Sequence, residues 1–260
     1  MELGLSGKTA LITGGSRGIG LAVAKALAAE GVRLHLAART AKDLEAAKAT
    51  ITQSHGVEVV LHAGDGGKSE TMTQLAAAVP ELDILVNNAG AIPVGTLEDL
   101  VESRWREAWE LKLFGYINLT RAVFTRMKAR RKGVIINVLG AAGERPTAGY
   151  IAGSTANAGL MAFTQALGGA STDHGIRVVG VNPGLIATDR MKDMMSARAL
   201  KELGDAGRWR ELIGDRPFGR PGEPEEVADV VTVLASDRAS YVSGTIVTVD
   251  GGGTTRAKGV

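Results

Sequence analysis

The sequence lacks cysteine entirely over its 260 residues, which excludes disulfides, thiolate metal ligands and cysteine nucleophiles. Its four histidines are scattered and form no helical H-E-x-x-H pattern, so no metal site is predicted. The net charge of +2 is too small to indicate nucleic acid or an anionic membrane as a partner. No apolar run approaches the length of a membrane span, and the first residues do not resemble a targeting segment. We therefore expect no membrane association and a cytoplasmic location.

Short β-branched or apolar runs alternate with longer helical patterns throughout the chain. This alternation predicts an α/β fold, a single Rossmann-type doubly wound domain over residues 1–260 with helices on both faces of a parallel sheet. Strands are expected at about 8–12, 32–36, 57–62, 82–86, 133–138, 177–181 and 245–249, and two long helices at about 102–130 and 149–171. The strand from 177 is expected to stop before Pro183, because proline cannot continue a central strand.

The segment from about 189 to 220 mixes methionine, leucine and tryptophan with many charges and shows no strand pattern. We interpret it as a mobile helical lid over a substrate pocket. A plain surface excursion is the alternative.

A glycine-rich turn, Thr13-Gly14-Gly15-Ser16-Arg17-Gly18-Ile19-Gly20, connects the first expected strand to the first expected helix. Glycines allow the backbone to approach a ligand closely, and a helix N-terminus attracts phosphate. Further glycine-bearing or polar segments follow the other strands, at Ala38-Arg39, Asp65, Asn87 to Gly90, Leu139-Gly140 and Pro183 to Thr188. Because ligands bind at the carboxyl ends of strands in such sheets, these segments predict a nucleotide site.

The second strand ends in Ala38-Arg39, without the carboxylate that would bind the ribose 2′-hydroxyl of NAD. Arg39 and Arg17 instead offer two guanidiniums suited to a 2′-phosphate. We therefore expect NADP(H) to be preferred over NAD(H). Two solvated surface arginines are the alternative.

Five segments together resemble the short-chain dehydrogenase/reductase (SDR) family: T-G-G-S-R-G-I-G, N-N-A-G at 87–90, V-N-P-G-L-I-A-T at 181–188, G-R-P-G-E-P-E-E-V-A at 219–228, and S-G…V-D-G-G at 243–252. The resemblance covers nearly the whole chain. It implies a seven-stranded sheet and a homotetramer or homodimer assembled through the two long helices. With the arguments above, it implies a cofactor site made by Gly14, Ser16, Arg17, Gly18, Ile19, Gly20, Arg39, Asp65, Asn88, Ala89, Gly90, Pro183, Gly184, Ile186 and Thr188.

The chain departs from the family at all four catalytic positions, which ordinarily hold Asn, Ser, Tyr and Lys. In motif order these positions carry Lys112, Gly140, Gly153 and Asn157. The pattern Y-x-x-x-K is absent from the whole sequence, whatever alignment is chosen. A positioned general acid contributes roughly 10²–10⁴ in rate, so a conventional carbonyl reduction needs a substitute.

Three substitutes are considered for the missing acid and base. The phenol of Tyr150, one helical turn before Gly153, could reach the pocket, or it could pack a loop or subunit contact. Lys112 and Asn157 look like an exchange of the family's Asn and Lys, so the ammonium could enter the cleft from the neighbouring helix; otherwise Lys112 is solvated or ion-paired. A hydroxyl of Ser154 or Thr155 is the third option, although both could simply occupy the first helical turns.

The two glycines at the serine and tyrosine positions leave room for a larger or differently placed ligand. Basic residues around the expected mouth could favour an anionic or CoA-bearing substrate, although interleaved carboxylates favour plain solvation. The leading hypothesis is an NADP(H)-dependent oxidoreductase that transfers hydride to or from a small carbonyl or alcohol substrate. The alternatives are an oligomeric NADP(H)-binding protein with little activity, and non-redox chemistry on the same scaffold.

Overall fold

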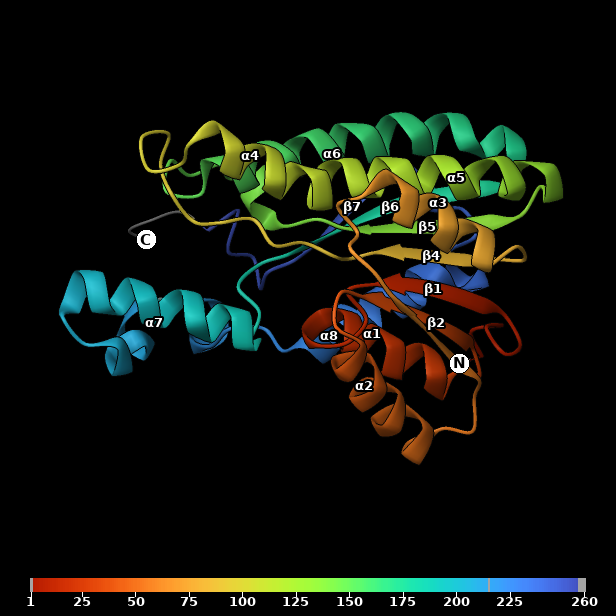
Figure 1. Cartoon of the computed structure of the whole chain (residues 1–260), viewed down its shortest axis with the longest axis horizontal. Helices are drawn as coiled ribbons and strands as arrows, with labels where there is room; N and C mark the ends of the chain where they lie inside the picture. Colours follow the sequence, from red (N-terminus) through yellow and green to blue (C-terminus); the bar gives the residue numbers. More distant parts are fainter. Residues whose placement is uncertain (1, 215, 257–260) are drawn as a thin grey trace.

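The computed structural model describes residues 2–214 and 216–256, and these residues form one seven-stranded, all-parallel sheet (Figure 1). The strand order is β3-β2-β1-β4-β5-β6-β7, so the order reverses between β1 and β4. The strands are β1 (Thr9–Thr13), β2 (Arg33–Ala38), β3 (Val59–Ala63), β4 (Ile84–Asn87), β5 (Gly133–Val138), β6 (Ile176–Pro183) and β7 (Ile246–Val249). The predicted Rossmann-type fold is confirmed.

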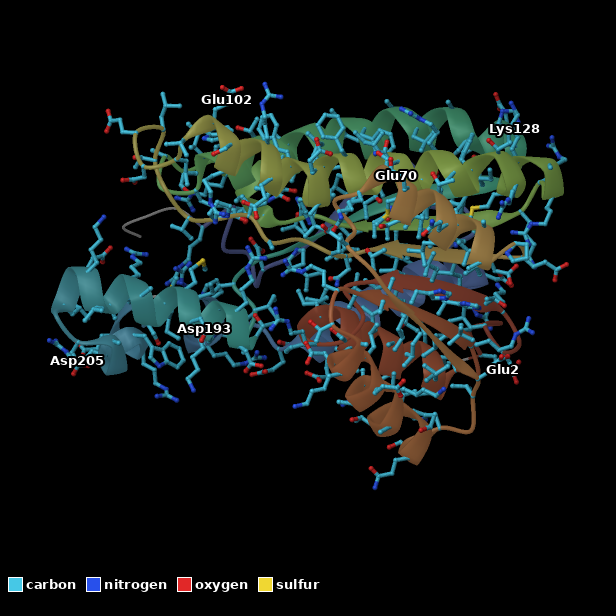
Figure 2. All side chains as sticks on the ribbon, viewed as in Figure 1. Glu2, Glu70, Glu102, Lys128, Asp193 and Asp205 are labelled. Carbon is cyan, nitrogen blue, oxygen red and sulfur yellow. The ribbon has the colours of Figure 1, made fainter. Side chains whose placement is uncertain are left out.

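Helices cover both faces of the sheet (Figure 1). One face carries α1 (Gly18–Ala29), α2 (Ala41–Ser54) and α8 (Pro224–Ala235), and the other carries α3 (Ser69–Ala78), α4 (Glu102–Trp109), α5 (Gly115–Arg130) and α6 (Ile151–Ser171). Central strands such as β1 and β4 are buried along their whole length, because both of their faces meet apolar helix surfaces. The side chains fill the layers between sheet and helices (Figure 2).

The strand β6 runs on through Pro183, where the sequence predicts its end. The backbone N–H of Gly180 donates to the Thr245 carbonyl just before β7, and that of Gly184 donates to the Val249 carbonyl of β7. The odd-numbered positions between them therefore face β5. There the β5 partner has already ended, since Val138 pairs with Val181. Pro183 therefore continues the strand without removing a ladder hydrogen bond.

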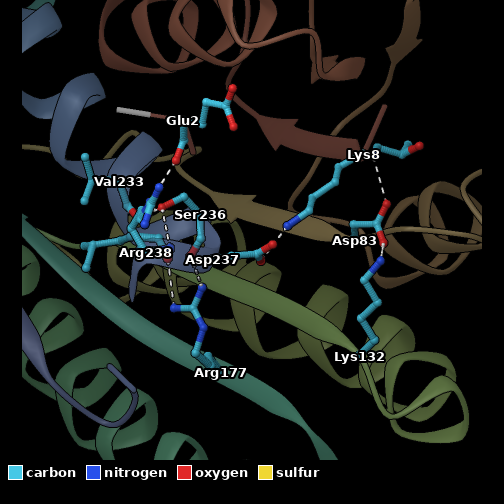
Figure 3. A network of polar contacts seen from close by, with 11 residues as sticks. Glu2, Lys8, Asp83, Lys132, Arg177, Val233, Ser236, Asp237 and Arg238 are labelled. Atoms are coloured by element: carbon cyan, nitrogen blue, oxygen red, sulfur yellow. Dashed lines mark hydrogen bonds and ion pairs between the residues drawn. The ribbon is translucent and has the colours of Figure 1, made fainter. Parts of the chain in front are cut away.

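A polar network ties together the amino ends of the strands (Figure 3). The carboxylate of Asp83 accepts from the Thr9 backbone N–H at 3.0 Å and pairs with Lys132 at 3.2 Å. Lys8 pairs with Asp237 at 2.7 Å. Since the strands are parallel, this network secures one end of the sheet and leaves the carboxyl ends free to form a site.

The segment after β6 is helical, as predicted, with α7 (Asp189–Leu203) followed by 3₁₀ turns at Ala206–Ile213 and Pro217–Gly219. It projects from one end of the molecule, beyond the carboxyl ends of the strands (Figure 1). No helix within the described ranges is both long enough and apolar enough to cross a bilayer.

Candidate nucleotide and active site

The glycine turn after β1 is packed so tightly that side chains are excluded at two of its positions. Gly14 has a φ of +66°, and a Cβ there would lie 2.9 Å from Asn88 Nδ2. A Cβ on Gly20 would overlap the carbonyl oxygen of Gly14. These two glycines therefore let the turn pack closely against Asn88 beside the start of α1, where N–H groups attract phosphate.

The N-N-A-G segment after β4 is fastened to the same turn. The backbone N–H groups of Asn88 and Ala89 both donate to the Thr13 hydroxyl, at 2.9 and 3.1 Å. The Asn88 amide donates in turn to the Thr13 carbonyl at 3.0 Å. The predicted residues of these two strand ends are thus brought together, including Ser16, Ile19 and Gly90 on the same two segments.

The segment after β6 closes the other side of the turn. Gly184 donates to the Val249 carbonyl at 2.9 Å, and Ile186 forms a parallel bridge with Gly222. The Thr188 side chain lies beside Gly18, whose hypothetical Cβ would be 3.2 Å from Thr188 Cγ2. Thr188 Oγ1 also accepts from the Met191 N–H and so caps α7. The segment from Pro183 to Thr188 therefore borders the predicted nucleotide site.

Three predicted cofactor residues lie exposed at the carboxyl ends of β1, β2 and β3. Arg17 precedes α1 as its N-cap, and Arg39 follows β2, which pairs with β1. Asp65 follows β3 and accepts from the Gly67 N–H at 3.0 Å. Both guanidiniums are available to a ligand at this edge, which is what a 2′-phosphate site requires.

Tyr150 occupies the space in which the family's tyrosine would project. It is the N-cap of α6, one residue earlier than a helical position, with φ −137° and ψ 40°. A Cβ built on Gly153 would overlap Cε1 and Cζ of the Tyr150 ring. Burial raises the pKa of the Tyr150 phenol, while a charge and a hydrogen bond from Arg190 lower it. A phenol is therefore present at this place, supplied from one turn earlier.

Lys112 lies in a π-helical turn, Glu110–Phe114, between α4 and α5. The Lys112 side chain is buried and only 7% exposed. Nζ donates to the carbonyl oxygens of Val138 and Leu139 at 2.7 and 3.3 Å, beyond the end of β5. The solvated or ion-paired alternative is therefore wrong for Lys112.

The ammonium of Lys112 also donates to the phenol oxygen of Tyr116 at 2.9 Å and lies 4.6 Å from the centre of that ring. Tyr116 OH donates onward to the Val138 carbonyl. Burial, together with a smaller effect of the charge of Arg190, lowers the pKa of Lys112 to about 7. The Lys112–Tyr116 pair is a contact that the sequence analysis missed, although its i, i+4 spacing permits it.

Asn157 is 3% exposed, and its side-chain oxygen has no partner among the described residues. Its Nδ2 lies 2.8 Å from where a Cβ of Gly140 would stand. A buried acceptor without a protein partner is commonly completed by a bound water, ion or ligand.

The two hydroxyls after Gly153 have local roles only. Ser154 Oγ accepts from the Thr147 N–H at 3.3 Å. Thr155 Oγ1 donates to the Ile151 carbonyl at 2.9 Å. Both hydroxyls therefore fit the simpler alternative, in which they hydrogen-bond locally at the start of α6.

Arg190 is one of the basic residues expected around the mouth of the site, and no sequence pattern gives it a role distinct from the others. It lies in the first turn of α7 and donates to the carbonyl oxygens of Gly90 and Ile92, the latter at 2.8 Å. Together with its hydrogen bond to Tyr150, these contacts connect α7 with the N-N-A-G segment and the phenol. No sequence motif marks this residue, because the contact joins segments that are distant in the chain.

Known structures resemble this chain over nearly its whole length. L-sorbose reductase from Gluconobacter frateurii, complexed with NADPH and L-sorbose, superposes with a TM-score of 0.92 at 32% identity, covering 99% of this chain and 100% of that one. An NAD⁺-bound xylitol dehydrogenase superposes with a TM-score of 0.88 at 25% identity, covering 95% and 99%. Both redox cofactors therefore occur on this fold.

The sequence comparisons agree. The 3-oxoacyl-[acyl-carrier-protein] reductase of Escherichia coli is 34% identical over 251 residues, covering 96% of this chain and 98% of the reductase. An acetoacetyl-CoA reductase from Shinella zoogloeoides is 33% identical over 247 residues, covering 94% and 98%. The family model for short chain dehydrogenases matches residues 8–199. The chain belongs to the short-chain dehydrogenase/reductase family, whose members are oxidoreductases that bind nicotinamide cofactors.

Proposed function

We propose that this protein is an NADP(H)-dependent oxidoreductase that reduces a small carbonyl substrate, with Tyr150 as the proton donor. The observation that carries the proposal is the Tyr150 ring above Gly153, in contact with Arg190. NADPH supplies the hydride when bound. Tyr150 gives its phenol proton to the carbonyl oxygen, in the role that a tyrosine three residues later has in the family.

The protonation states suit reduction. The Tyr150 phenol is protonated at neutral pH and can donate; burial raises its pKa and so weakens it as an acid, while the charge and hydrogen bond of Arg190 act in the opposite direction. The ammonium of Lys112 contributes positive potential near the place where negative charge develops on the substrate oxygen. Asn157 offers its side-chain oxygen to a ribose hydroxyl, and the N–H groups at the start of α1 receive the phosphates.

The preference for NADP(H) belongs to the same proposal and rests on Arg17 and Arg39. The NADPH complex of L-sorbose reductase supports it, while the NAD⁺ complex of xylitol dehydrogenase shows that the fold alone does not decide. We also propose that α7 with the following turns, about 189–220, forms a substrate lid held by Arg190, within a single domain. We further propose that the protein forms a homotetramer or homodimer and is located in the cytoplasm.

Turnover tests the catalytic assignment. NADPH oxidation is followed with a panel of ketones, quinones, 2-oxo acids and acyl-CoA compounds. We expect Tyr150→Phe to lower kcat at least 100-fold, the loss typical of a general acid. Tyr241→Phe is the matched control, because Tyr241 is fully exposed. If Tyr150→Phe keeps its turnover, the Tyr150 phenol is not the proton donor. If the unmodified protein turns over none of the substrates, the alternative of an NADP(H)-binding protein with little activity is favoured.

Cofactor titration tests the arginines. Nicotinamide fluorescence is used to measure the affinities for NADPH and NADH. We expect Arg17→Ser and Arg39→Ser each to weaken NADPH binding about tenfold or more, since each removes a charge-assisted contact, and to leave NADH binding unchanged. Equal affinities of the unmodified protein for both cofactors would refute the preference.

A further inference from the structure

Arg190 and Lys112 are two basic side chains that both lie against Gly90: Arg190 donates to its carbonyl oxygen, and a Cβ built on Gly90 would be 3.7 Å from Lys112 Nζ. The hydrogen bonds of Lys112 go to two carbonyl oxygens and a phenol. Those of Arg190 go to two carbonyl oxygens and the Tyr150 phenol. No ion pair reaches either residue within residues 2–214 and 216–256. Two like charges held by neutral groups create a positive potential that a bound anion relieves.

Other arginines nearby in the chain are paired differently. Arg198, also on α7, pairs with Glu202 at 2.7 Å, and Arg208 in the following turn pairs with Glu211 at 2.7 Å. A carboxylate three or four residues away neutralises each of them. Arg190 has no such partner in the described structure, so its charge remains directed at the site.

The guanidinium of Arg190 has capacity for a ligand. The carbonyls of Gly90 and Ile92 use one N–H of each terminal nitrogen out of its five N–H groups, and the interaction with Tyr150 leaves others for a ligand. A carboxylate is the anion that best matches a guanidinium, because two oxygens meet two N–H groups. The side chain of Arg190 is exposed, so its remaining N–H groups can be reached by a ligand. The room that the sequence predicted beside Gly140 and Gly153 is not there, because Asn157 and the Tyr150 ring fill it.

The contact between Arg190 and Tyr150 limits where that carboxylate stands in the substrate. The anion-binding group and the proton donor lie within one hydrogen bond of each other. A substrate that uses both therefore carries its carboxylate beside its reacting carbonyl. The adjacent carbons of a 2-oxo acid meet that requirement, whereas a distant carboxylate does not.

We propose that Arg190, assisted by the charge of Lys112, binds the carboxylate of a 2-oxo acid substrate whose carbonyl oxygen faces Tyr150. In the reduction, the carbonyl carbon accepts the hydride that NADPH provides, and the π-bond pair moves to the oxygen. That oxygen takes the Tyr150 proton, solvent reprotonates the phenolate, and the product is a 2-hydroxy acid with its carboxylate unchanged. The chemical step rests on the function proposed above, but the binding of the carboxylate is tested without it.

The test is calorimetric titration of the full-length protein with oxamate, a 2-oxo acid analogue that resists reduction, with and without saturating NADPH. The neutral analogue oxamide is the matched ligand. We expect oxamate to bind at least tenfold more tightly than oxamide. Its affinity should rise about threefold or more from pH 8 to pH 6, because Lys112, with a pKa of about 7, becomes charged over that interval. Inorganic phosphate at equal concentration should displace oxamate poorly.

Paired variants locate the site. Arg190→Met should weaken oxamate binding at least tenfold, while Arg198→Met, the same change on the same helix, should alter it less than twofold. Lys112→Met should remove the pH dependence. Lys128→Met, at the far end of the molecule from Asp193 of α7, should not (Figure 2). Circular dichroism and NADPH affinity check that each variant is folded.

Several results would overturn the proposal: no oxamate binding, equal binding of oxamide, full displacement by phosphate, or equal losses in Arg190→Met and Arg198→Met. If Arg190→Met does not fold, the oxamate-to-oxamide ratio and the pH dependence of the unmodified protein still decide. Selective oxamate binding without turnover of any 2-oxo acid would support this site and refute the proposed reduction. Turnover of neutral ketones without oxamate binding would support the proposed reduction and refute the carboxylate site.

Discussion

Lys112 makes a quantitative prediction about stability against pH. In the folded protein its pKa is lowered to about 7, whereas an unfolded lysine has a pKa of about 10.4. Between these values the unfolded chain holds a proton that the folded chain has released, so stability rises with pH. Integrated from pH 7 to pH 9, the gain is about 2 kcal/mol. The same contribution is lost as the pH falls toward 7, where the buried ammonium is charged.

The assay is urea unfolding, at fixed protein concentration, of the unmodified protein and Lys112→Met at pH 7, 8 and 9. The two proteins share every other titratable group, so the change in their difference with pH isolates Lys112. From pH 7 to pH 9 we expect the free energy of unfolding of the unmodified protein to rise by about 2 kcal/mol relative to that of Lys112→Met. Lys128→Met, which removes an exposed lysine from α5, is the control and should run parallel to the unmodified protein. A pH-independent difference for Lys112→Met would show that its ammonium is not desolvated.

Two further predictions concern glycines. Gly153→Ala places a methyl group where the Tyr150 ring lies. We expect the free energy of unfolding in urea to fall by about 1–3 kcal/mol and most carbonyl turnover to be lost. The control is Gly169→Ala on the same helix, which has open space around it and should be neutral or stabilising. Gly20→Ala forces its methyl group into the Gly14 carbonyl and should weaken NADPH binding at least about tenfold in fluorescence titration. If Gly20→Ala binds NADPH as tightly as the unmodified protein, the glycine turn is not part of the cofactor site.

The fold could be predicted from the sequence because its signals are local. Apolar and β-branched runs placed all seven strands to within about two residues, and the glycine-bearing or polar segments that follow them predicted a nucleotide site. The end of β6 at Pro183 was mispredicted. The rule against proline in a central strand assumes partners on both sides, and there β5 has already ended.

The catalytic side of the site could be predicted only as an absence. The missing Y-x-x-x-K pattern is evident in the sequence, but the place of the Tyr150 ring depends on the N-cap geometry of α6. Lys112 is buried within a π-helical turn, which leaves no periodic signal. The contact of Arg190 with Gly90 joins residues 100 positions apart. Such contacts arise from tertiary packing, which spacing along the chain does not encode.

The strand order has a consequence for synthesis on the ribosome. β1, β2 and β3 pair with their sequence neighbours, so this half of the sheet can form from the first part of the chain. The other edge of β1 receives its partner only when β4 emerges. At ordinary translation rates this buried, apolar strand stays open on one side for on the order of seconds. During that interval the nascent chain presents an unpaired edge, the kind of surface that chaperones protect from aggregation.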